Sequence, residues 1–240
     1  MSFWFFSRQR LEINLGIELA VELHNHVLPG VDDGARSMQE ALQMMLFWAE
    51  MGYQKVIATP HQNTLMNPSV QEIDSAYSRL QYQLQEQEIP LYLTVAGEYL
   101  LEPELRERIG ALRTFGPKNY LLVELGFWIL PIGWQHFFFE LQCAGYTLVL
   151  AHPERYEYAN ESQLKTWYEQ GLFLQINLLS LAKAYGKKAQ QKAEYLLEKG
   201  WVHFIGSDMH RADQIEAVRY ALKHKLIRKR MERFLNPTLL

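Results

Sequence analysis

The sequence is poor in cysteine, because Cys143 is the only one among 240 residues. A single thiol cannot form a disulfide within the chain, so a disulfide-stapled scaffold is excluded and a reducing compartment such as the cytoplasm fits the composition. A cysteine-based phosphatase is also excluded. It needs an arginine six positions after the thiolate, and that position holds Val149.

The sequence also lacks a long apolar run and a strong net charge. No apolar stretch reaches the roughly 18 residues of a membrane-spanning helix. The apolar part of the aromatic start, residues 1–10, is too short for a signal peptide. We expect this start to pack on the domain or on a partner, with shallow contact to a membrane surface as the alternative. The net charge of −3 gives no sign of a nucleic-acid-binding surface.

The apolar content is sufficient for a sizeable core. With 48% hydrophobic and 21% charged residues, the chain fits one globular domain. We predict a single domain over residues 1–240. Residues 1–16 would be an N-terminal extension, and residues 212–240 a C-terminal helix and tail.

Seven predicted strands alternate with helices along the chain. Capping-box spacing marks two helix starts, Ser37 with Glu40 and Ser69 with Glu72. The predicted helices begin at residues 37 and 69 and then cover residues 102–109, 134–143, 161–170, 187–199 and 212–235. The predicted strands cover residues 17–23, 55–59, 91–96, 120–123, 146–151, 173–176 and 201–205. This order predicts parallel strands joined by right-handed crossovers, in an open sheet or in a closed barrel.

Polar side chains at the strand ends decide between these two architectures. They follow six of the seven predicted strands and are His24, His26, His61, Glu98, Glu124, His152, Asp208 and His210. A barrel brings all these ends to one mouth, whereas an open sheet spreads them along a crevice. We therefore predict a distorted seven-stranded β/α barrel.

The same side chains suggest a metal centre. His24 and His26 alternate along a strand, so their imidazoles share a face. Each residue alone is also compatible with a capping or ordinary polar role. Together, however, five histidines and at least three carboxylates exceed the coordination of one ion. Two or three divalent ions would satisfy them, and a nitrogen and oxygen ligand set suits manganese, iron or zinc. Such centres activate water for hydrolysis, especially of phosphate esters.

Metal-dependent amidohydrolases also begin with His-x-His on a β/α barrel. They typically carry a bridging lysine at the end of the fourth strand. The corresponding residue here is Glu124, which argues against that class.

The ordered set of motifs resembles the polymerase-and-histidinol-phosphatase (PHP) superfamily, and more closely the bacterial capsule-type protein-tyrosine phosphatases. The resemblance covers residues 20–220. Its motifs are His24-x-His26, Leu28-Pro29-Gly30, Asp32-Asp33-Gly34, Thr59-Pro60-His61, Gly97-Glu98, Glu124, His152-Pro153-Glu154-Arg155, the run from Leu174 to Leu181, and Ser207-Asp208-x-His210.

The resemblance implies a (β/α)7 barrel that holds two to three divalent ions, manganese first and iron or zinc otherwise. The implied ligand sets are His24, His26, Glu98 and Asp208; Glu98, Glu124 and His152; and Asp33, His61 and His210. Arg155 would bind substrate phosphate, because guanidinium matches phosphate oxygens. Catalysis would rest on Arg155, His61, His210 and Asp208. Asp32 would be a supporting or turn residue, and Gly34 would adopt a backbone conformation that other residues resist.

The resemblance further implies a cytoplasmic phosphatase that acts on phosphotyrosine. The expected substrate is the C-terminal tail of a bacterial tyrosine kinase that controls capsule or exopolysaccharide synthesis. The alternatives are a small-molecule phosphatase such as a histidinol phosphatase, a nuclease, and a non-catalytic metal-binding interaction module. Four aromatic residues beside ligand positions would form a rim or belong to ordinary packing: Tyr99, Phe127, Trp128 and Tyr156. The basic stretch of residues 223–233 would be a solvated helix face or contact an acidic tail or anionic lipid.

Overall fold

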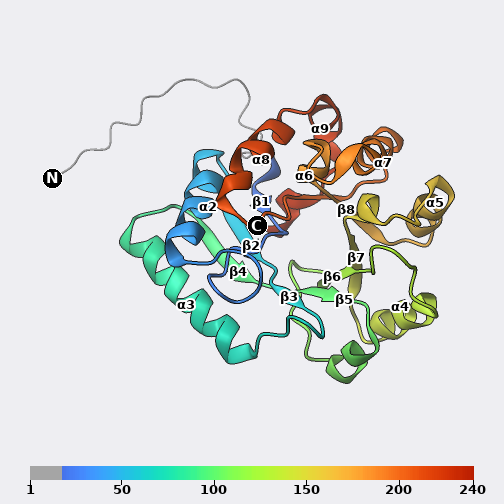
Figure 1. Cartoon of the computed structure of the whole chain (residues 1–240), viewed down its shortest axis with the longest axis horizontal. Helices are drawn as coiled ribbons and strands as arrows, with labels where there is room; N and C mark the ends of the chain where they lie inside the picture. Colours follow the sequence, from blue (N-terminus) through green and yellow to red (C-terminus); the bar gives the residue numbers. More distant parts are fainter. Residues whose placement is uncertain (1–17) are drawn as a thin grey trace.

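A computed structural model describes residues 18–240 of the chain, and Figure 1 shows short strands surrounded by helices. The predicted packing or membrane contact of residues 1–10 lies outside the described residues. Within residues 18–240, no helix is both long enough and apolar enough to cross a membrane.

The strands form two parallel sheets. The first has the order β1-β2-β4 and the second the order β3-β5-β6-β7-β8-β9. Every pairing between these strands is parallel. Their bounds are β1 Val21–Glu22, β2 Lys55–Ala58, β3 His61–Gln62, β4 Tyr92–Val95, β5 Glu98–Leu100, β6 Tyr120–Glu124, β7 Thr147–Ala151, β8 Phe173–Asn177 and β9 Phe204–Gly206.

The two sheets are parts of one distorted seven-stranded barrel. β2 corresponds to the strand predicted over residues 55–59, and β3 continues its path beyond Pro60, which interrupts the ladder because proline has no N–H. β4 and β5 are likewise separated at Gly97. The first and last strands meet in a parallel bridge between Asn25 and Met209, where the His26 N–H donates to the Met209 carbonyl at 3.0 Å. The predicted barrel is therefore confirmed.

The helices cover the outside of this barrel (Figure 1). Ser37 and Ser69 cap α2 and α3 as predicted, and the reciprocal capping box is complete at Ser69 and Glu72. The helices are α2 Met38–Glu50, α3 Val70–Glu86, α4 Trp134–Cys143, α5 Glu161–Glu169, α6 Leu178–Leu181, α7 Gly186–Lys199, α8 Ile215–Leu222 and α9 Lys225–Arg230. Short 3-10 turns cover η1 Pro103–Arg108, η2 Pro153–Arg155, η3 Ala212–Gln214, η4 Met231–Arg233 and η5 Asn236–Leu239.

The predictions for the first strand and for the last helix are wrong in their extent. Residues 18 and 19 are helical, and Ala20 has a φ of 59°, so the first strand starts only at Val21. The single helix predicted over residues 212–235 is interrupted after Leu222, because His224 has an extended backbone and its ring caps the new helix α9.

Apolar side chains fill the barrel interior at the N-terminal end of the strands. They include Val21, Leu23, Ile57, Phe115, Tyr120, Leu122, Val149, Phe204 and Leu239. Asn236 closes this end, since its buried amide Nδ2 donates to the Val21 carbonyl at 2.9 Å and to the Ile205 carbonyl at 2.7 Å. Its Oδ1 accepts from the Ile205 N–H at 3.0 Å. The opposite end of the barrel is polar.

Candidate metal centre

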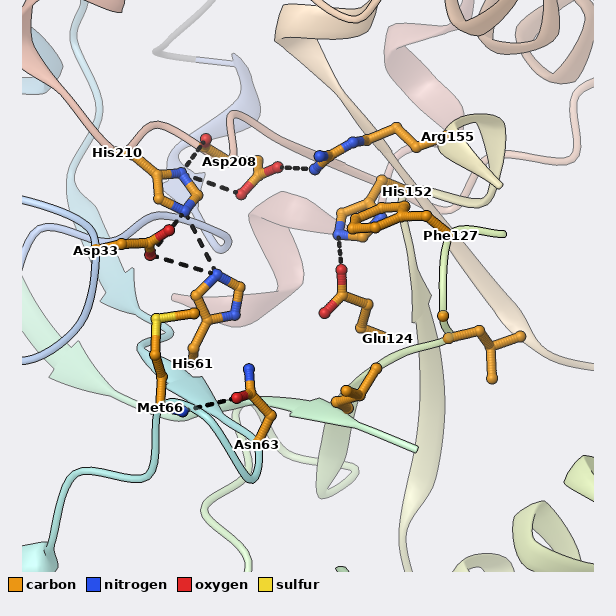
Figure 2. Close-up of a pocket in the computed structure, with 13 residues that line it drawn as sticks. Asp33, His61, Asn63, Met66, Glu124, Phe127, His152, Arg155, Asp208 and His210 are labelled. Atoms are coloured by element: carbon orange, nitrogen blue, oxygen red, sulfur yellow. Dashed lines mark hydrogen bonds and ion pairs between the residues drawn. The ribbon is translucent and has the colours of Figure 1, made fainter. Parts of the chain in front are cut away.

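The C-terminal ends of the barrel strands bring all nine predicted ligands to one mouth. His24 and His26 follow β1, His152 follows β7, and Asp208 and His210 follow β9. The other four are His61 at the start of β3, Glu98 at the start of β5, Glu124 at the end of β6, and Asp33 in the segment between β1 and α2. Figure 2 shows side chains from opposite sides of the barrel pointing toward one another.

Glu98 lies at the centre of this group and is 1% exposed. Its Oε1 is 2.9 Å from His152 Nε2 and 3.2 Å from His24 Nε2. Its Oε2 is 3.0 Å from His61 Nδ1 and 3.5 Å from His26 Nε2. Four imidazoles from different parts of the chain therefore surround a single buried carboxylate.

Asp208 uses its two oxygens for different neighbours. Oδ1 faces the imidazoles, at 3.4 Å from His24 Nε2 and 3.3 Å from His26 Nε2. Oδ2 accepts from Arg155 at 2.6 Å, Asn177 Nδ2 at 2.7 Å and the Tyr185 hydroxyl at 3.2 Å. These three donors fix the carboxylate, so that Oδ1 points into the cluster.

The paired acidic residues Asp32 and Asp33 have separate roles. The exposed Asp33 has its Oδ1 at 3.6 Å from His61 Nε2 and 3.5 Å from His210 Nε2. Asp32 instead lies 2.7 Å from His26 Nδ1 and accepts from the backbone N–H of His61 and of Gly34. Asp32 thus orients His26 and the backbone at His61 without facing the cluster, which agrees with the supporting role expected for it.

Gly34 is required for a different reason from the one predicted. A Cβ on Gly34 would lie 2.1 Å from the His26 carbonyl oxygen, and its φ is not in the left-handed region. The close approach of two backbone segments therefore excludes a side chain at this position. The Ala35 N–H, which donates to the same carbonyl at 2.9 Å, holds the segments together.

The outer nitrogen of His24 is held by Gln175, a residue to which the sequence analysis assigned no role. Gln175 Oε1 lies 2.9 Å from His24 Nδ1, and Gln175 Nε2 donates to Asn177 Oδ1 at 2.9 Å. This arrangement leaves His24 Nε2 with its lone pair toward the cluster. Gln175 and Asn177 alternate along β8 and so face the same side of a buried strand. This pair of polar residues was the sequence signal that could have identified them as neighbours of the cluster.

The turn between His152 and Arg155 is tied to the end of β8 by a buried carboxylate. Glu154 Oε1 accepts from the Asn177 N–H at 2.9 Å and from the Ser180 hydroxyl at 2.7 Å. Burial raises the pKa of Glu154 to about 7, although these hydrogen bonds oppose the shift. These hydrogen bonds fix the turn and thereby the orientation of the His152 and Arg155 side chains that it carries.

Burial and mutual charge shape the titration of the cluster. Burial alone would raise the pKa of Glu98 and of Asp208, but neighbouring imidazoles, with Arg155 beside Asp208, hold both well below their usual range. Burial, reinforced by the charges of Glu98 and Asp208, raises the pKa of Glu124 well above its usual value. Burial lowers the pKa of His152 to about 4. His152 is thus a neutral imidazole, the form that binds metals.

Several buried atoms in the cluster are suited to metal ions. His61 Nδ1 and Glu98 Oε2 are 3.0 Å apart but lack hydrogen-bond geometry, and His24 Nε2 and His26 Nε2 also have no hydrogen-bond partner among the described residues. Unpartnered buried polar atoms are costly. Imidazole nitrogens and carboxylate oxygens are ligands for manganese, iron and zinc. The residues therefore fit divalent ions.

Three groups of side chains bring one ligand atom each within 4.8 Å of the others. The groups are His24, His26, Glu98 and Asp208; His61, Glu98 and Glu124; and His26, Asp33, His61 and His210. The first group is identical to one of the ligand sets that the family resemblance implies. The last group is another implied set, Asp33, His61 and His210, with His26 added. The remaining group contains His61 where His152 was expected. His152 Nε2 nevertheless lies 2.9 Å from Glu98 Oε1 and 3.7 Å from Glu124 Oε1.

A cavity of about 340 Å³ opens above the cluster and is bordered by Arg155. The Arg155 guanidinium carbon lies 4.5 Å from the centre of the Phe127 ring and 3.9 Å from that of Tyr185. Burial would lower the pKa of Arg155, but the charge of Asp208 raises it. Arg155 is therefore a permanent cation held in a fixed orientation at the edge of the cavity (Figure 2).

The predicted aromatic rim is only partly present. Tyr99 and Tyr156 are core residues. The Tyr99 hydroxyl accepts from the Arg113 N–H, and the Tyr156 hydroxyl donates to the Ala151 carbonyl, both at 2.7 Å. Phe127 lines the cavity, and Trp128 beside it is 77% exposed. Alternation along the strand directs Tyr99 away from Glu98 and into the core.

Comparison with known proteins agrees with this geometry. Residues 20–238 match the family described as capsular polysaccharide synthesis, CpsB/CapC. The chain is 30% identical over 195 residues to the tyrosine-protein phosphatase YwqE of Bacillus subtilis (strain 168), covering 79% of this chain and 77% of that protein. It is 26% identical over 207 residues to the tyrosine-protein phosphatase CpsB of Streptococcus agalactiae, covering 80% and 84%.

A solved structure extends the similarity to the whole fold. It comes from the crystal structures of YwqE from Bacillus subtilis and CpsB from Streptococcus pneumoniae, described as metal-dependent tyrosine phosphatases. The TM-score is 0.79 at 28% identity, over 92% of this chain and 94% of that chain.

Proposed function

The chain belongs to the CpsB/CapC family of capsular polysaccharide synthesis, and from this membership we propose that it is a metal-dependent tyrosine-protein phosphatase. It hydrolyses the phosphate monoester of phosphotyrosine. The observation that carries this proposal is the convergence of nine imidazole and carboxylate side chains below a cavity that Arg155 borders. This combination of metal-binding side chains and a fixed cation suits the hydrolysis of an anionic ester.

The nine side chains would hold two to three divalent ions, manganese ahead of iron or zinc. Bound ions supply an activated water nucleophile and neutralise the charge of the phosphoryl group. The groups around Glu98 share that carboxylate, which is consistent with ions that lie close together. Asp33, His61 and His210 border the cavity and would meet the substrate from the side opposite Arg155.

Arg155 binds the phosphoryl oxygens. One of its N–H groups donates to Asp208 Oδ2, and Phe127 and Tyr185 cover the guanidinium plane. The remaining N–H groups are donors for phosphate at the edge of the cavity. Because Asp208 contacts both the imidazoles and Arg155, it sets the distance between the ligand cluster and the phosphate-binding cation. His61, His210 and Asp208, together with Arg155, form the catalytic set.

The physiological substrate in this proposal is the tyrosine-bearing C-terminal tail of a bacterial kinase that controls capsule or exopolysaccharide synthesis, and the reaction takes place in the cytoplasm. A flexible tail can enter a cavity at the end of a barrel, which a folded surface cannot reach. The family membership supports the link to capsule synthesis.

Two measurements on the purified protein test the proposal. Elemental analysis after gentle purification should give two to three manganese, iron or zinc ions per chain. Full activity with one ion or none would contradict the multinuclear centre. Catalytic efficiency should be highest on a phosphotyrosine peptide when it is compared with a phosphoserine peptide and histidinol phosphate at one metal concentration. A strong preference for histidinol phosphate would indicate a small-molecule phosphatase instead.

A further inference from the structure

Two loops beside the cavity carry unusually exposed apolar side chains. We call residues 63–68, which follow β3, and residues 125–133, which follow β6, the mouth loops. Among the described residues, the large apolar side chains that exceed 76% exposure are Leu65, Tyr92, Trp128, Ile129 and Ile132. All of these except Tyr92 belong to the mouth loops. Large apolar groups exposed together usually mark a binding surface.

Both mouth loops border the same cavity. Asn63 and Met66 line it from the first loop, and Leu125, Gly126 and Phe127 line it from the second. Figure 2 shows Asn63 and Met66 on one side of the cavity and Phe127 on the other. A second hollow of about 510 Å³ shares Asp33 and Met66 with this cavity and continues along Leu65 and Pro68. The exposed side chains thus adjoin the place where the ester is held.

The first loop is held in a defined conformation that exposes Leu65. The Asn63 side chain accepts from the N–H groups of Leu65 and Met66, at 2.9 and 2.8 Å. The Asn63 N–H in turn donates to the Met66 carbonyl at 3.0 Å, and Arg108 donates to Asn67 Oδ1 at 3.0 Å. Leu65 is therefore presented outward by a hydrogen-bonded turn.

Neither mouth loop contains a charged residue. An anionic membrane would be met by lysine and arginine beside the apolar groups, whereas the basic stretch of this chain lies on α9 and the adjoining residues 223–233. The charged part of the substrate binds at the ligand cluster and Arg155. What remains for the loops is the uncharged part of the same molecule, which favours a polypeptide over a lipid surface.

We propose that the mouth loops bind apolar side chains that flank the phosphotyrosine in a polypeptide substrate. This inference rests on the proposed function and defines the substrate class more closely: a tyrosine phosphate with large apolar residues near it in the sequence. Small aryl phosphates use only the cluster and Arg155, so they gain nothing from the loops. The loops would thereby set the preference for polypeptide over metabolite.

The test compares three substrates in three variants. The variants are the double variant Trp128→Ser with Ile132→Ser on one loop and Leu65→Ser on the other. The control is Tyr92→Ser on β4, which is as exposed as Trp128 but lies outside both mouth loops. The substrates are a phosphotyrosine peptide with leucine and isoleucine flanks, the same peptide with glycine and serine flanks, and para-nitrophenyl phosphate.

We expect kcat/KM on the apolar-flanked peptide to fall about tenfold in each loop variant, mainly through KM, as for loss of a binding contact. The rate on para-nitrophenyl phosphate should change less than about twofold and serves as the check on folding. The Tyr92→Ser variant should match the wild type on all three substrates. If the double variant folds poorly, the Leu65→Ser variant supplies the test from the other loop.

Other results would overturn the inference in distinguishable ways. Equal kinetics of loop variants and wild type on the apolar-flanked peptide would exclude the loops from substrate binding. If the wild type sediments with vesicles of phosphatidylserine and phosphatidylcholine and the loop variants do not, while their peptide kinetics are unchanged, the loops bind a lipid surface instead. A wild-type protein that hydrolyses para-nitrophenyl phosphate but neither peptide would overturn the proposed function together with this inference.

Discussion

The two ends of the barrel interior are built from opposite kinds of side chain on the same strands. Leu23 belongs to the apolar N-terminal end and His24 to the polar C-terminal end, although they are neighbours in sequence. Leu122 and Glu124 divide β6 in the same way. Residues only one or two positions apart in the sequence therefore belong to the apolar core in one case and to the polar cluster in the other.

The comparison shows which end provides stability. Burial of apolar side chains such as Leu122 and Phe204 is favourable by about 25 cal/mol per Å². Burial of charged side chains such as Glu98 and Asp208 is costly unless their partners are well placed. The apolar end must therefore offset the cost of assembling the polar end. Substitutions at the two ends should consequently have different readouts, and the following tests run from the largest expected effect to the smallest.

Removal of a proposed metal ligand at the polar end should have the largest effect on rate. We expect His152→Ala and Asp208→Asn each to lower kcat by about a thousandfold or more, because the activation of water depends on the ligand set. Steady-state kinetics with elemental analysis would measure the effect, and circular dichroism should remain native. Retention of a tenth of the wild-type rate in either variant would mean that the residue is not a ligand.

Removal of Arg155, the proposed phosphate-binding cation, should lower the rate less. Arg155→Ala should lower kcat/KM on an aryl phosphate by a factor that corresponds to about 2–4 kcal/mol, through loss of a preorganised contact in the transition state. The metal content should stay at the wild-type level, which separates this variant from the ligand variants. An effect below tenfold would assign Arg155 to structure.

At the apolar end, Asn236→Ala should change stability and not rate. The change leaves the carbonyls of Val21 and Ile205 and the Ile205 N–H without their buried partner. We expect a loss of about 2–3 kcal/mol in the free energy of unfolding, measured by urea denaturation. A large fall in kcat with unchanged stability would show that the two ends are not separable.

A smaller effect should appear in the pH dependence of stability. His203 lies at the N-terminal end of β9, where its Nδ1 accepts from the Leu174 N–H at 3.0 Å, and burial lowers its pKa to about 4. Because the unfolded imidazole has a pKa near 6.5, the unfolded chain binds a proton first as the pH falls. The stability that the neutral ring contributes is present above pH 6.5 and is lost between about pH 6.5 and 4.

His203→Gln keeps an acceptor and removes this titration. The variant should therefore lose less stability than the wild type when denaturation at pH 7.5 is compared with denaturation at pH 5. An identical pH dependence in both proteins would show that other groups dominate this range.

The smallest effect is expected for Cys143→Ser. The thiol is exposed at the end of α4 and does not line the cavity. Activity and stability should both stay within error of the wild type. A phosphocysteine trapped during turnover would instead overturn the metal-dependent mechanism, because it would identify the thiol as nucleophile.

The sequence was sufficient to predict the barrel and eight residues of the cluster, whereas Asp33 was expected only from the family resemblance. Strand ends followed by histidine or a carboxylate are local signals, and the capping box at Ser69 is one as well. Contacts between segments that are far apart in the sequence could not be predicted. The covering of Arg155 by Tyr185 and the closure of the barrel by Asn236 depend on which loops meet in space. Neither position has a periodic or capping pattern around it.

The extent of individual elements was also hard to predict. Residues 17–23 alternate like a strand, but Glu22 is buried beside Ser207 and the ladder starts only at Val21. Basic and apolar residues continue past Leu222 in a helical pattern, yet the ring of His224 supports a new helix start. In both places a single tertiary or capping contact outweighs the local pattern.

The seam between the first and last strands has a consequence for how the protein is made. The Asp208 N–H donates to the His24 carbonyl at 2.7 Å, and the Ser207 hydroxyl contacts both that carbonyl and Glu22 Oε1. These contacts join residues that are separated by almost the whole chain, so they form late in folding. A nascent chain whose β9 has not yet emerged from the ribosome contains seven of the nine candidate ligands but lacks Asp208 and His210. Phosphatase activity should therefore begin only after β9 and the residues up to His210 have emerged from the ribosome.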